Sequence, residues 1–219
     1  VTHIQTNSIY RKDMYYISGD YIVLEIKMKD FKIIPVVVVN DELDTRTKLN
    51  GLREGGIMVA EITFRTAYAE KGIRLALEEY KDMCIGAGTV INKYQALKAI
   101  NMGVEFIVSP GFSKEIAELC AKNNVKYFPG CVTPTEIMEA IECGIEVVKF
   151  FPANIYGGLK AIDALSKPFP NIKFLPTGGV NYDNIDEFLT HPNIYAVGGS
   201  FMMKGDIAEN CKKLSKWLD

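Results

Sequence analysis

The chain has 219 residues, 48% of them hydrophobic, and its 25 basic and 27 acidic side chains give a formal net charge of -2. This length fits one large domain, and single barrels commonly reach it. No clustered basic charge indicates a nucleic-acid partner. The longest apolar runs, such as residues 33–39, are far shorter than the ~20 residues that span a bilayer. We therefore expect neither nucleic acid nor a membrane among its partners.

The cysteines and the first residues bear on location and domain organisation. Five cysteines are scattered along the chain without a CxxC pair, at Cys84, Cys120, Cys131, Cys143 and Cys211. This usage predicts reduced, mostly buried thiols rather than a disulfide framework. Residues 1–20 show neither a signal-peptide pattern nor a helical or alternating one, so we expect a cytoplasmic protein. We divide it into an N-terminal extension, residues 1–20, and one domain, residues 21–219.

From about Phe31 onward, short apolar runs alternate with longer segments of helical periodicity. This alternation is typical of βαβ units and a parallel sheet. Eight strands are predicted, and they begin at Lys32, Met58, Cys84, Glu105, Lys126, Glu146, Lys173 and Tyr195.

Each predicted strand is followed by a predicted helix. The helices cover residues 44–54, 67–80, 93–102, 114–123, 134–142, 159–165, 184–189 and 208–218. The fifth has a clear start, because Thr133 is a suitable N-cap, Pro134 takes the first helical position and Glu136 completes a capping box. The pattern predicts an α/β protein with a (β/α)8 TIM barrel. An open doubly wound sheet is the alternative, although no GxGxxG opens its first unit.

The carboxyl ends of the strands surround the active site of such a barrel, and a phosphate site is frequently built after strands seven and eight. These ends carry Glu61, Arg65, Thr89, Pro110, Lys149, Gly178, Gly179, Gly199 and Ser200. Taken alone, each has an ordinary structural explanation, such as an ion pair, a helix cap or a turn. Together they place an acid, a guanidinium, an amine and two glycine-rich turns at one barrel mouth.

Lys149 is the unusual member of this set, because it interrupts the apolar stretch EVVKFFPA. A lysine is almost never fully buried unless it is paired, and the ordinary explanation is a side chain that reaches solvent by its methylene stem. Burial among aromatic side chains disfavours the charged form of an amine and leaves a neutral nucleophile for attack on a ketone.

The other strand-end residues fit the needs of a Schiff-base reaction. Glu61 offers a carboxylate for the proton transfers of the carbinolamine and Schiff-base steps. Arg65 offers a bidentate fork for a substrate carboxylate. The two glycine-rich turns expose backbone N–H groups that can surround a phosphate.

The sequence offers little for competing chemistries. It has two histidines, His3 and His191, which are too few for a histidine-rich zinc site and hard to combine into a Ser/His/Asp triad. We expect no metal and no cofactor, and we interpret His191 as a surface loop residue.

The motifs EITFRT, GAGTV, SPGF, KFFPA, PTGGV and GGS, in this order, resemble those of the 2-keto-3-deoxy-6-phosphogluconate (KDPG) and 4-hydroxy-2-oxoglutarate (KHG) aldolases. These are class I aldolases of the Entner-Doudoroff type, and the resemblance covers about Tyr21 to the C-terminus. It implies a homotrimer of (β/α)8 barrels that cleaves the phosphorylated keto-deoxy acid to pyruvate and glyceraldehyde 3-phosphate. A further candidate substrate is 4-hydroxy-2-oxoglutarate, which would give pyruvate and glyoxylate.

The resemblance also implies roles for individual residues. Lys149 corresponds to the Schiff-base lysine and Glu61 to the proton-transfer residue. The pyruvate half would lie at Arg65, Thr89 and Pro110, with Phe151 beside the lysine. Thr177 is implied as a further substrate contact, and the phosphate would lie at Gly178, Gly179, Gly199 and Ser200.

Two departures from the family and three alternatives remain open. The extension before Tyr21 is longer than the resemblance leads us to expect. Many relatives carry an acidic residue where this chain has Asn154-Ile155-Tyr156, which leaves the substrate preference open. The alternatives are a stereochemical variant acting on 2-dehydro-3-deoxy-6-phosphogalactonate, a phosphate-binding isomerase or epimerase with Glu61 as base, and a catalytically silent trimeric barrel. The isomerase leaves Lys149 unexplained.

Overall fold

The structure, a computed structural model, describes residues 14–17, 20–23 and 31–218. The chain divides into two compact units, residues 1–30 and residues 31–219. In the first unit, β1 (Met14–Ile17) pairs antiparallel with β2 (Asp20–Val23), a hairpin that the sequence did not predict. The expected division between residues 20 and 21 stays a prediction, because residues 18–19 and 24–30 lie outside the described part.

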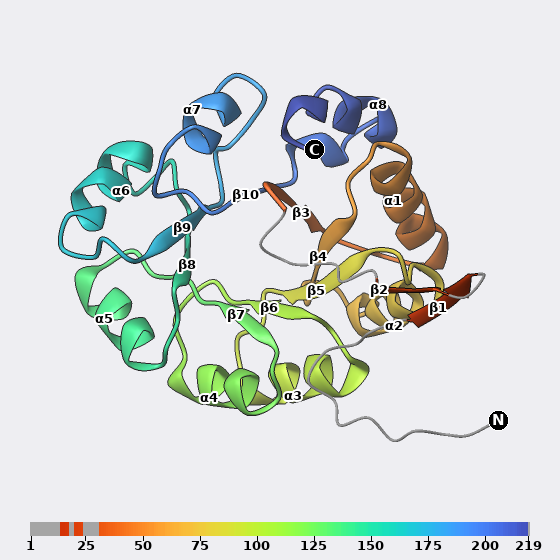
Figure 1. The fold of residues 1–219 in the computed structure, drawn as a ribbon, viewed down its shortest axis with the longest axis horizontal. Helices are drawn as coiled ribbons and strands as arrows, with labels where there is room; N and C mark the ends of the chain where they lie inside the picture. The colour runs from red at the N-terminus through yellow and green to blue at the C-terminus, as the bar shows by residue number, and fades with distance from the viewer. Residues whose placement is uncertain (1–13, 18–19, 24–30, 219) are drawn as a thin grey trace. The chain divides into compact units, whose positions relative to one another are not determined.

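The second unit is a barrel of parallel strands (Figure 1). One sheet has the order β10-β3-β4-β5-β6-β7, and β8 pairs with β9. The bounds are β3 Ile33–Val37, β4 Val59–Thr63, β5 Cys84–Gly88, β6 Phe106–Val108, β7 Lys126–Phe128, β8 Val147–Phe150, β9 Lys173–Pro176 and β10 Val197–Gly199. All eight predicted strands are therefore present.

Isolated bridges close the ring on both sides of the β8–β9 pair. On the β7 side, Gly130 bridges Lys149, whose backbone makes two hydrogen bonds of 2.7 and 2.9 Å across the gap. On the β10 side, Thr177 bridges Gly198. Because the ring is closed, the open doubly wound sheet is excluded, and the predicted (β/α)8 barrel is confirmed.

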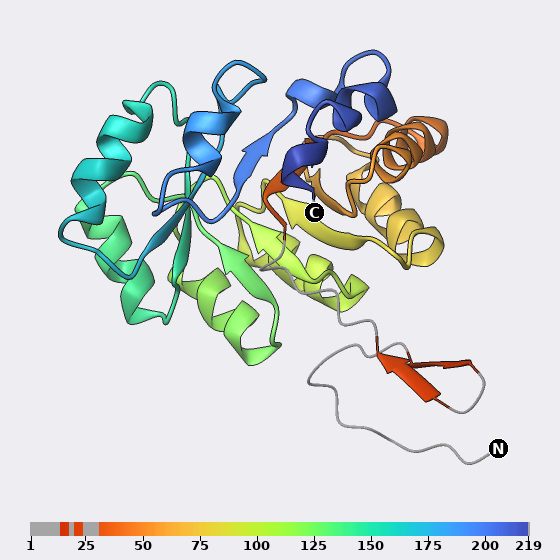
Figure 2. The same cartoon turned by 45° about the horizontal axis from the view of Figure 1, so that its top comes forward.

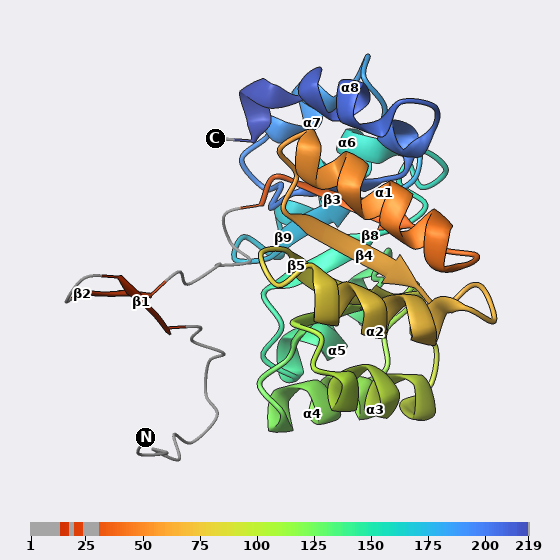
Figure 3. The same cartoon turned by 90° about the vertical axis from the view of Figure 1, so that its right-hand side faces the viewer.

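Helices pack around the outside of the strands (Figures 1 and 2). Their bounds are α1 Glu42–Glu54, α2 Ala69–Glu79, α3 Lys93–Met102, α4 Lys114–Lys122, α5 Pro134–Glu142, α6 Gly158–Ser166, α7 Ile185–Leu189 and α8 Ile207–Lys212. Figure 3 shows α1 and α2 as neighbours outside β4, and the two helices are in contact. The short helices η2 (Phe201–Met203) and η3 (Ser215–Trp217) precede and follow α8 in the chain.

Several helix boundaries differ from the prediction, and two of the differences have a clear local cause. The last helix was expected to run to Leu218, but α8 ends at Lys212. The reason is that Leu214 N donates to Cys211 O, three residues back, which tightens the chain into a 3₁₀ turn. The second helix begins at Ala69 rather than Ala67, because the preceding residues form a turn held by side-chain hydrogen bonds.

The strands are buried on both faces, which explains their nearly continuous apolar sequences. Around β8 and β9 the core between strands and helices includes Phe150, Phe174, Ile137 and Ile162. The buried polar or charged side chains of the described residues are Thr45, Glu61, Thr63, Ser109, Lys149 and Thr177. In the same part of the chain, no helix combines the length and apolar character needed to cross a membrane.

The predicted capping box at the start of α5 is confirmed. Thr133 Oγ1 accepts from Glu136 N, and Glu136 Oε2 accepts from the N–H groups of Thr133 and Val132 at 2.9 and 2.8 Å. Burial acts to raise the pKa of Glu136, but these hydrogen bonds outweigh it and hold the pKa below its ordinary value. The stabilisation is therefore present above the ordinary pKa and lost as the pH falls through the lowered one.

We predict that Glu136→Ala lowers the free energy of unfolding at pH 7 by about 1 kcal/mol, because two backbone donors lose their acceptor. Urea unfolding at pH 7 and at pH 3 would measure this loss, which should shrink at the lower pH. Glu139→Ala is the control, since Glu139 is an exposed side chain of the same helix. Equal losses in both variants, or a loss independent of pH, would contradict the prediction.

Candidate active site

Glu61 and Lys149 meet inside the barrel from opposite sides of the ring. Glu61 lies on β4 and Lys149 on β8, four strands apart in either direction. The Lys149 Nζ atom is 3.6 Å from Glu61 Oε1, and the two residues are 3% and 1% exposed. The structure thus brings together the two residues that the sequence predicted as the catalytic pair, and it excludes the solvent-reaching explanation for Lys149.

The Glu61 carboxyl group is buried without a hydrogen bond. Neither of its oxygens has a hydrogen-bond partner among the described residues, since 3.6 Å is too long for one. Burial raises the pKa of Glu61, and the charges of Lys149 and Arg65 oppose this shift without cancelling it. A buried polar group without a partner is costly and calls for an explanation. A buried carboxyl group with a raised pKa beside an amine is suited to general acid and base chemistry.

Room for Glu61 comes from the inner face of β5. Gly86 and Gly88 pair in register with Glu61 and Thr63. A β-carbon on Gly88 would lie 2.2 Å from Glu61 Oε1, and one on Gly86 would lie 2.3 Å from the Phe106 ring. The sequence analysis missed Gly88 as a site residue, although the alternating glycines of GAG indicate an open inner face.

Arg65 is held by the neighbouring strand end. Its Nε donates to Thr89 Oγ1 at 2.9 Å, and its terminal nitrogens have no acceptor among the described residues. Thr89 has a φ of 56°, a left-handed conformation that is uncommon for a residue with a side chain. Such conformations cost free energy and cluster at functional sites. Arg65 and Thr89, which were predicted to lie at one site, are therefore in contact, and the terminal nitrogens of Arg65 are available to a ligand.

Pro110 is placed close to the strand of the lysine by Gly130. A β-carbon on Gly130 would lie 2.0 Å from the Pro110 carbonyl oxygen, so no side chain fits between them. Gly130 is also the residue that bridges Lys149. Sequence reasoning missed Gly130, because the contact joins two strand ends that are distant in sequence.

Phe151 and Thr177 flank the lysine. The centroid of the Phe151 ring is 5.2 Å from Lys149 Nζ. Thr177 is 6% exposed, and its N–H donates to Phe150 O at 3.0 Å. Its Oγ1 would lie 2.2 Å from a β-carbon on Gly198, so this glycine is required for the hydroxyl to fit.

The two glycine-rich turns follow neighbouring strands. Gly178 and Gly179 have φ values of 88° and 87°, which favour glycine. Within the described residues, the N–H groups of Gly179 and Val180 donate to no protein acceptor. Gly199 ends β10 and the exposed Ser200 follows it, and this strand is bridged to Thr177, the residue that precedes the first turn. The free backbone donors of the first turn are suited to an anion.

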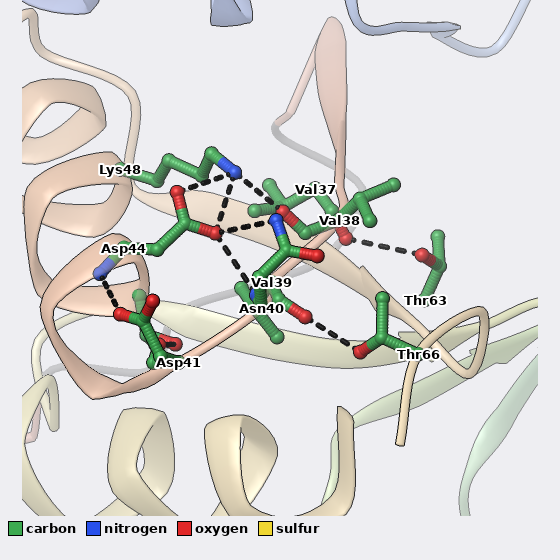
Figure 4. Close-up of polar contacts among 10 residues, drawn as sticks. Val37, Val38, Val39, Asn40, Asp41, Asp44, Lys48, Thr63 and Thr66 are labelled. Carbon is green, nitrogen blue, oxygen red and sulfur yellow. Dashed lines mark hydrogen bonds and ion pairs between the residues drawn. The ribbon is translucent and has the colours of Figure 1, made fainter. Parts of the chain in front are cut away.

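A polar network fixes the end of β3, as Figure 4 shows. The three carbonyl groups of residues 37–39 each accept a hydrogen bond from a side chain. The donors are Thr63 Oγ1 at 3.2 Å, Lys48 Nζ at 2.7 Å and Thr66 Oγ1 at 2.6 Å. Sequence reasoning missed this network, because each donor is an ordinary surface-type residue until the strands are placed together.

The remaining candidates lie apart from this site. His191 Nε2 is 2.8 Å from Asp163 Oδ1, in a loop bonded to the amino end of β9 rather than at the carboxyl ends of the strands, and His3 lies outside the described residues. Among the residues that are described, no group of three or more His, Cys, Asp or Glu side chains could hold a metal ion.

A buried lysine beside a carboxyl group at the mouth of a (β/α)8 barrel is the arrangement of an aldolase that acts through a Schiff base. A family model described as "KDPG and KHG aldolase" matches residues 24–216. The chain therefore belongs to the KDPG and KHG aldolase family.

Individual relatives agree with this assignment. The chain is 41% identical over 172 residues to the 2-dehydro-3-deoxy-phosphogluconate aldolase of Treponema pallidum, covering 78% of this chain and 82% of that one. It is 39% identical to the enzyme of the same name from Haemophilus influenzae, covering 84% and 87%. The KDPG aldolase of Legionella pneumophila, solved with pyruvate captured as a covalent carbinolamine, is 35% identical with a TM-score of 0.79, covering 87% and 93%.

We predict that Gly88→Ala displaces the Glu61 carboxyl group, because the new methyl group would lie 2.2 Å from Oε1, too close for both to fit. The displaced group would be less buried, so its pKa should fall toward the ordinary value of a glutamate. A crystal structure and a carbon-13 NMR titration of the carboxyl group would measure both effects. Gly111→Ala is the control, since a β-carbon there meets nothing within 4 Å. An unmoved Glu61 with an unchanged pKa would refute the prediction.

Proposed function

We propose that the protein cleaves 2-dehydro-3-deoxy-6-phosphogluconate to pyruvate and glyceraldehyde 3-phosphate through a Schiff base on Lys149. The observation that carries this proposal is the buried Lys149 Nζ, 3.6 Å from the carboxyl group of Glu61, which has no hydrogen-bond partner among the described residues. The names of the relatives from T. pallidum and H. influenzae support the substrate. The carbinolamine of the L. pneumophila enzyme supports the covalent step.

The reaction divides into bond-making steps at Lys149 and proton transfers at Glu61. The neutral amine attacks the C2 carbonyl, and the carbonyl oxygen takes a proton to give a carbinolamine. Glu61 then gives a proton to the carbinolamine hydroxyl, which leaves as water, so that an iminium forms.

The same two residues serve the cleavage. The Glu61 carboxylate takes the proton of the C4 hydroxyl as the C3–C4 bond breaks, and the electron pair of that bond moves toward the iminium to give an enamine. Glyceraldehyde 3-phosphate leaves. Return of a proton to C3 and hydrolysis by water release pyruvate and restore the amine.

The pyruvate half would bind between Arg65 and the lysine. The terminal nitrogens of Arg65 are free to pair with the substrate carboxylate in a bidentate manner. Thr89 fixes this guanidinium, while Pro110, Phe151 and Thr177 would surround the three-carbon unit.

The phosphate would bind at the two glycine-rich turns. The N–H groups of Gly179 and Val180, which have no acceptor in the described part of the chain, support this placement, and Gly178, Gly199 and Ser200 complete the proposed site. The smaller substrate 4-hydroxy-2-oxoglutarate lacks a phosphate and would use the same catalytic pair. The name KHG/KDPG aldolase of the Escherichia coli relative, 33% identical over 81% of this chain, supports it as a second substrate.

The proposal includes a homotrimer in the cytoplasm. Exposed apolar side chains that a second copy would cover support the self-association: Met138 and Ile141 on α5, and Ile155 after β8. Sedimentation equilibrium at several protein concentrations would test the stoichiometry.

We predict that Lys149→Met abolishes both substrate cleavage and the adduct trapped by borohydride in the presence of pyruvate, because no amine remains beside Glu61. Intact-mass measurement and peptide mapping would locate the adduct in the unaltered protein. Lys173→Met is the matched control, since Lys173 is a strand lysine bound to Pro192 O. A Lys149→Met protein that cleaves the substrate at a near-normal rate would end the Schiff-base proposal.

We predict that Glu61→Gln slows turnover by ~10² to 10⁴, the usual loss when general acid–base catalysis is removed. The pyruvate adduct should still form, but slowly. The acidic limb of the pH–rate profile should lie above the range of an ordinary glutamate in the unaltered protein, because burial raises the pKa of Glu61, and it should vanish in the variant. Full activity in Glu61→Gln would reduce this residue to a structural partner.

A further inference from the structure

Two threonines, Thr63 and Thr66, lie on either side of the turn that carries Arg65. Thr63 Oγ1 donates to Val37 O at 3.2 Å, and Thr66 Oγ1 donates to Val39 O at 2.6 Å, as Figure 4 shows. Val37 is the last residue of β3 and Val39 follows it by two residues, and β3 pairs with β4 on the side away from β5. The residues immediately before and after this turn are therefore tied to the preceding strand.

The acceptors on β3 are themselves held in place. Lys48 Nζ donates to Val38 O at 2.7 Å and pairs with Asp44 at 2.7 Å. The Asp44 carboxylate also accepts from Asn40 N at 2.9 Å. Burial acts to raise the pKa of Asp44, but Lys48 and Asn40 outweigh it, so the pKa lies below its ordinary value. The end of β3 is thus a fixed support.

The turn is also tied to β5 on its other side. Phe64 N donates to Gly88 O at 2.8 Å, and Arg65 Nε donates to Thr89 Oγ1 at 2.9 Å. The Arg65 side chain is exposed, and an exposed arginine loses considerable rotamer freedom when it binds a ligand. Fixing its backbone and its Nε beforehand lowers that cost, which is how supporting hydrogen bonds preorganise a binding group.

We infer that Thr66 is a positioning residue for Arg65: its hydrogen bond to Val39 O fixes the turn from the β3 side, as Thr89 fixes the guanidinium from the β5 side. The motif EITFRT alone does not assign this role to Thr66, because its hydroxyl bonds to a segment that is distant in sequence. The inference rests on the proposed role of Arg65 in binding the substrate carboxylate. Thr66 acts through Arg65 and is not required to touch the substrate.

The test uses Thr66→Val, which keeps the shape of the side chain and removes its donor. The rate of borohydride-trapped adduct formation would be measured against pyruvate concentration, and in parallel with acetone, a ketone without a carboxylate. We expect the half-saturating pyruvate concentration to rise by about threefold to tenfold, the effect of one lost hydrogen bond. The maximal rate with pyruvate and the rate with acetone should stay unchanged.

Two further variants show whether the hydroxyl is responsible. Thr66→Ser restores the donor and should restore the pyruvate concentration dependence. Thr190→Val removes a comparable hydroxyl, which donates to Asp186 O on α7, and should have no effect. Equal losses with pyruvate and acetone in Thr66→Val would indicate a general structural role and overturn the inference.

Arg65→Met separates the inference from the proposed function. If Arg65→Met weakens the response to pyruvate while Thr66→Val behaves like the unaltered protein, the inference alone is wrong. If Arg65→Met leaves the response unchanged, the proposed carboxylate site fails and the inference fails with it. Circular dichroism and thermal unfolding of all variants would confirm that each is folded.

Discussion

The structure depends on the burial of an amine and a carboxyl group at a separation of 3.6 Å in the barrel interior. Removing two ionisable groups from water is costly, and their mutual attraction repays this only in part when hydrogen bonds are absent. The rest of the barrel makes the arrangement possible. Opposite strands bring the groups together, glycines leave the required space, and neighbouring backbone contacts fix the lysine strand. The pair is better explained by chemistry than by stability, since an apolar pair would fill the space at lower cost.

Much of this arrangement could be predicted from the sequence. Lys149 could be found because a lysine in an otherwise apolar strand contradicts the burial of its neighbours. The predicted strands indicated which residues lie at their carboxyl ends, and Glu61, Arg65 and Thr89 were expected there. The capping box of α5 was predictable because Thr133 and Glu136 interact over three residues. Local spacing determines each of these features.

The missed features depend on contacts between distant segments. Gly88 and Gly130 matter because of what an added β-carbon would collide with, and the colliding atoms belong to Glu61 on β4 and to Pro110, which follows β6. Lys48 and Asp44 have the spacing of an ordinary surface pair on a helix. The additional bond from Lys48 to Val38 O is what joins this pair to the end of β3. No spacing rule within one segment contains that information.

The β8–β9 pair carries the lysine, yet it is attached to the other strands by isolated bridges rather than by continuous ladders. Proteins open locally where such cooperative backbone contacts are few. A fluctuation that parts these bridges would separate Lys149 from Gly130 while the six-stranded ladder persists. Mild heating should therefore abolish the activity that depends on Lys149 while most of the secondary structure remains. The protein would lose its activity before its fold. Amide hydrogen exchange in the barrel would be fastest at the bridges on the two sides of the β8–β9 pair.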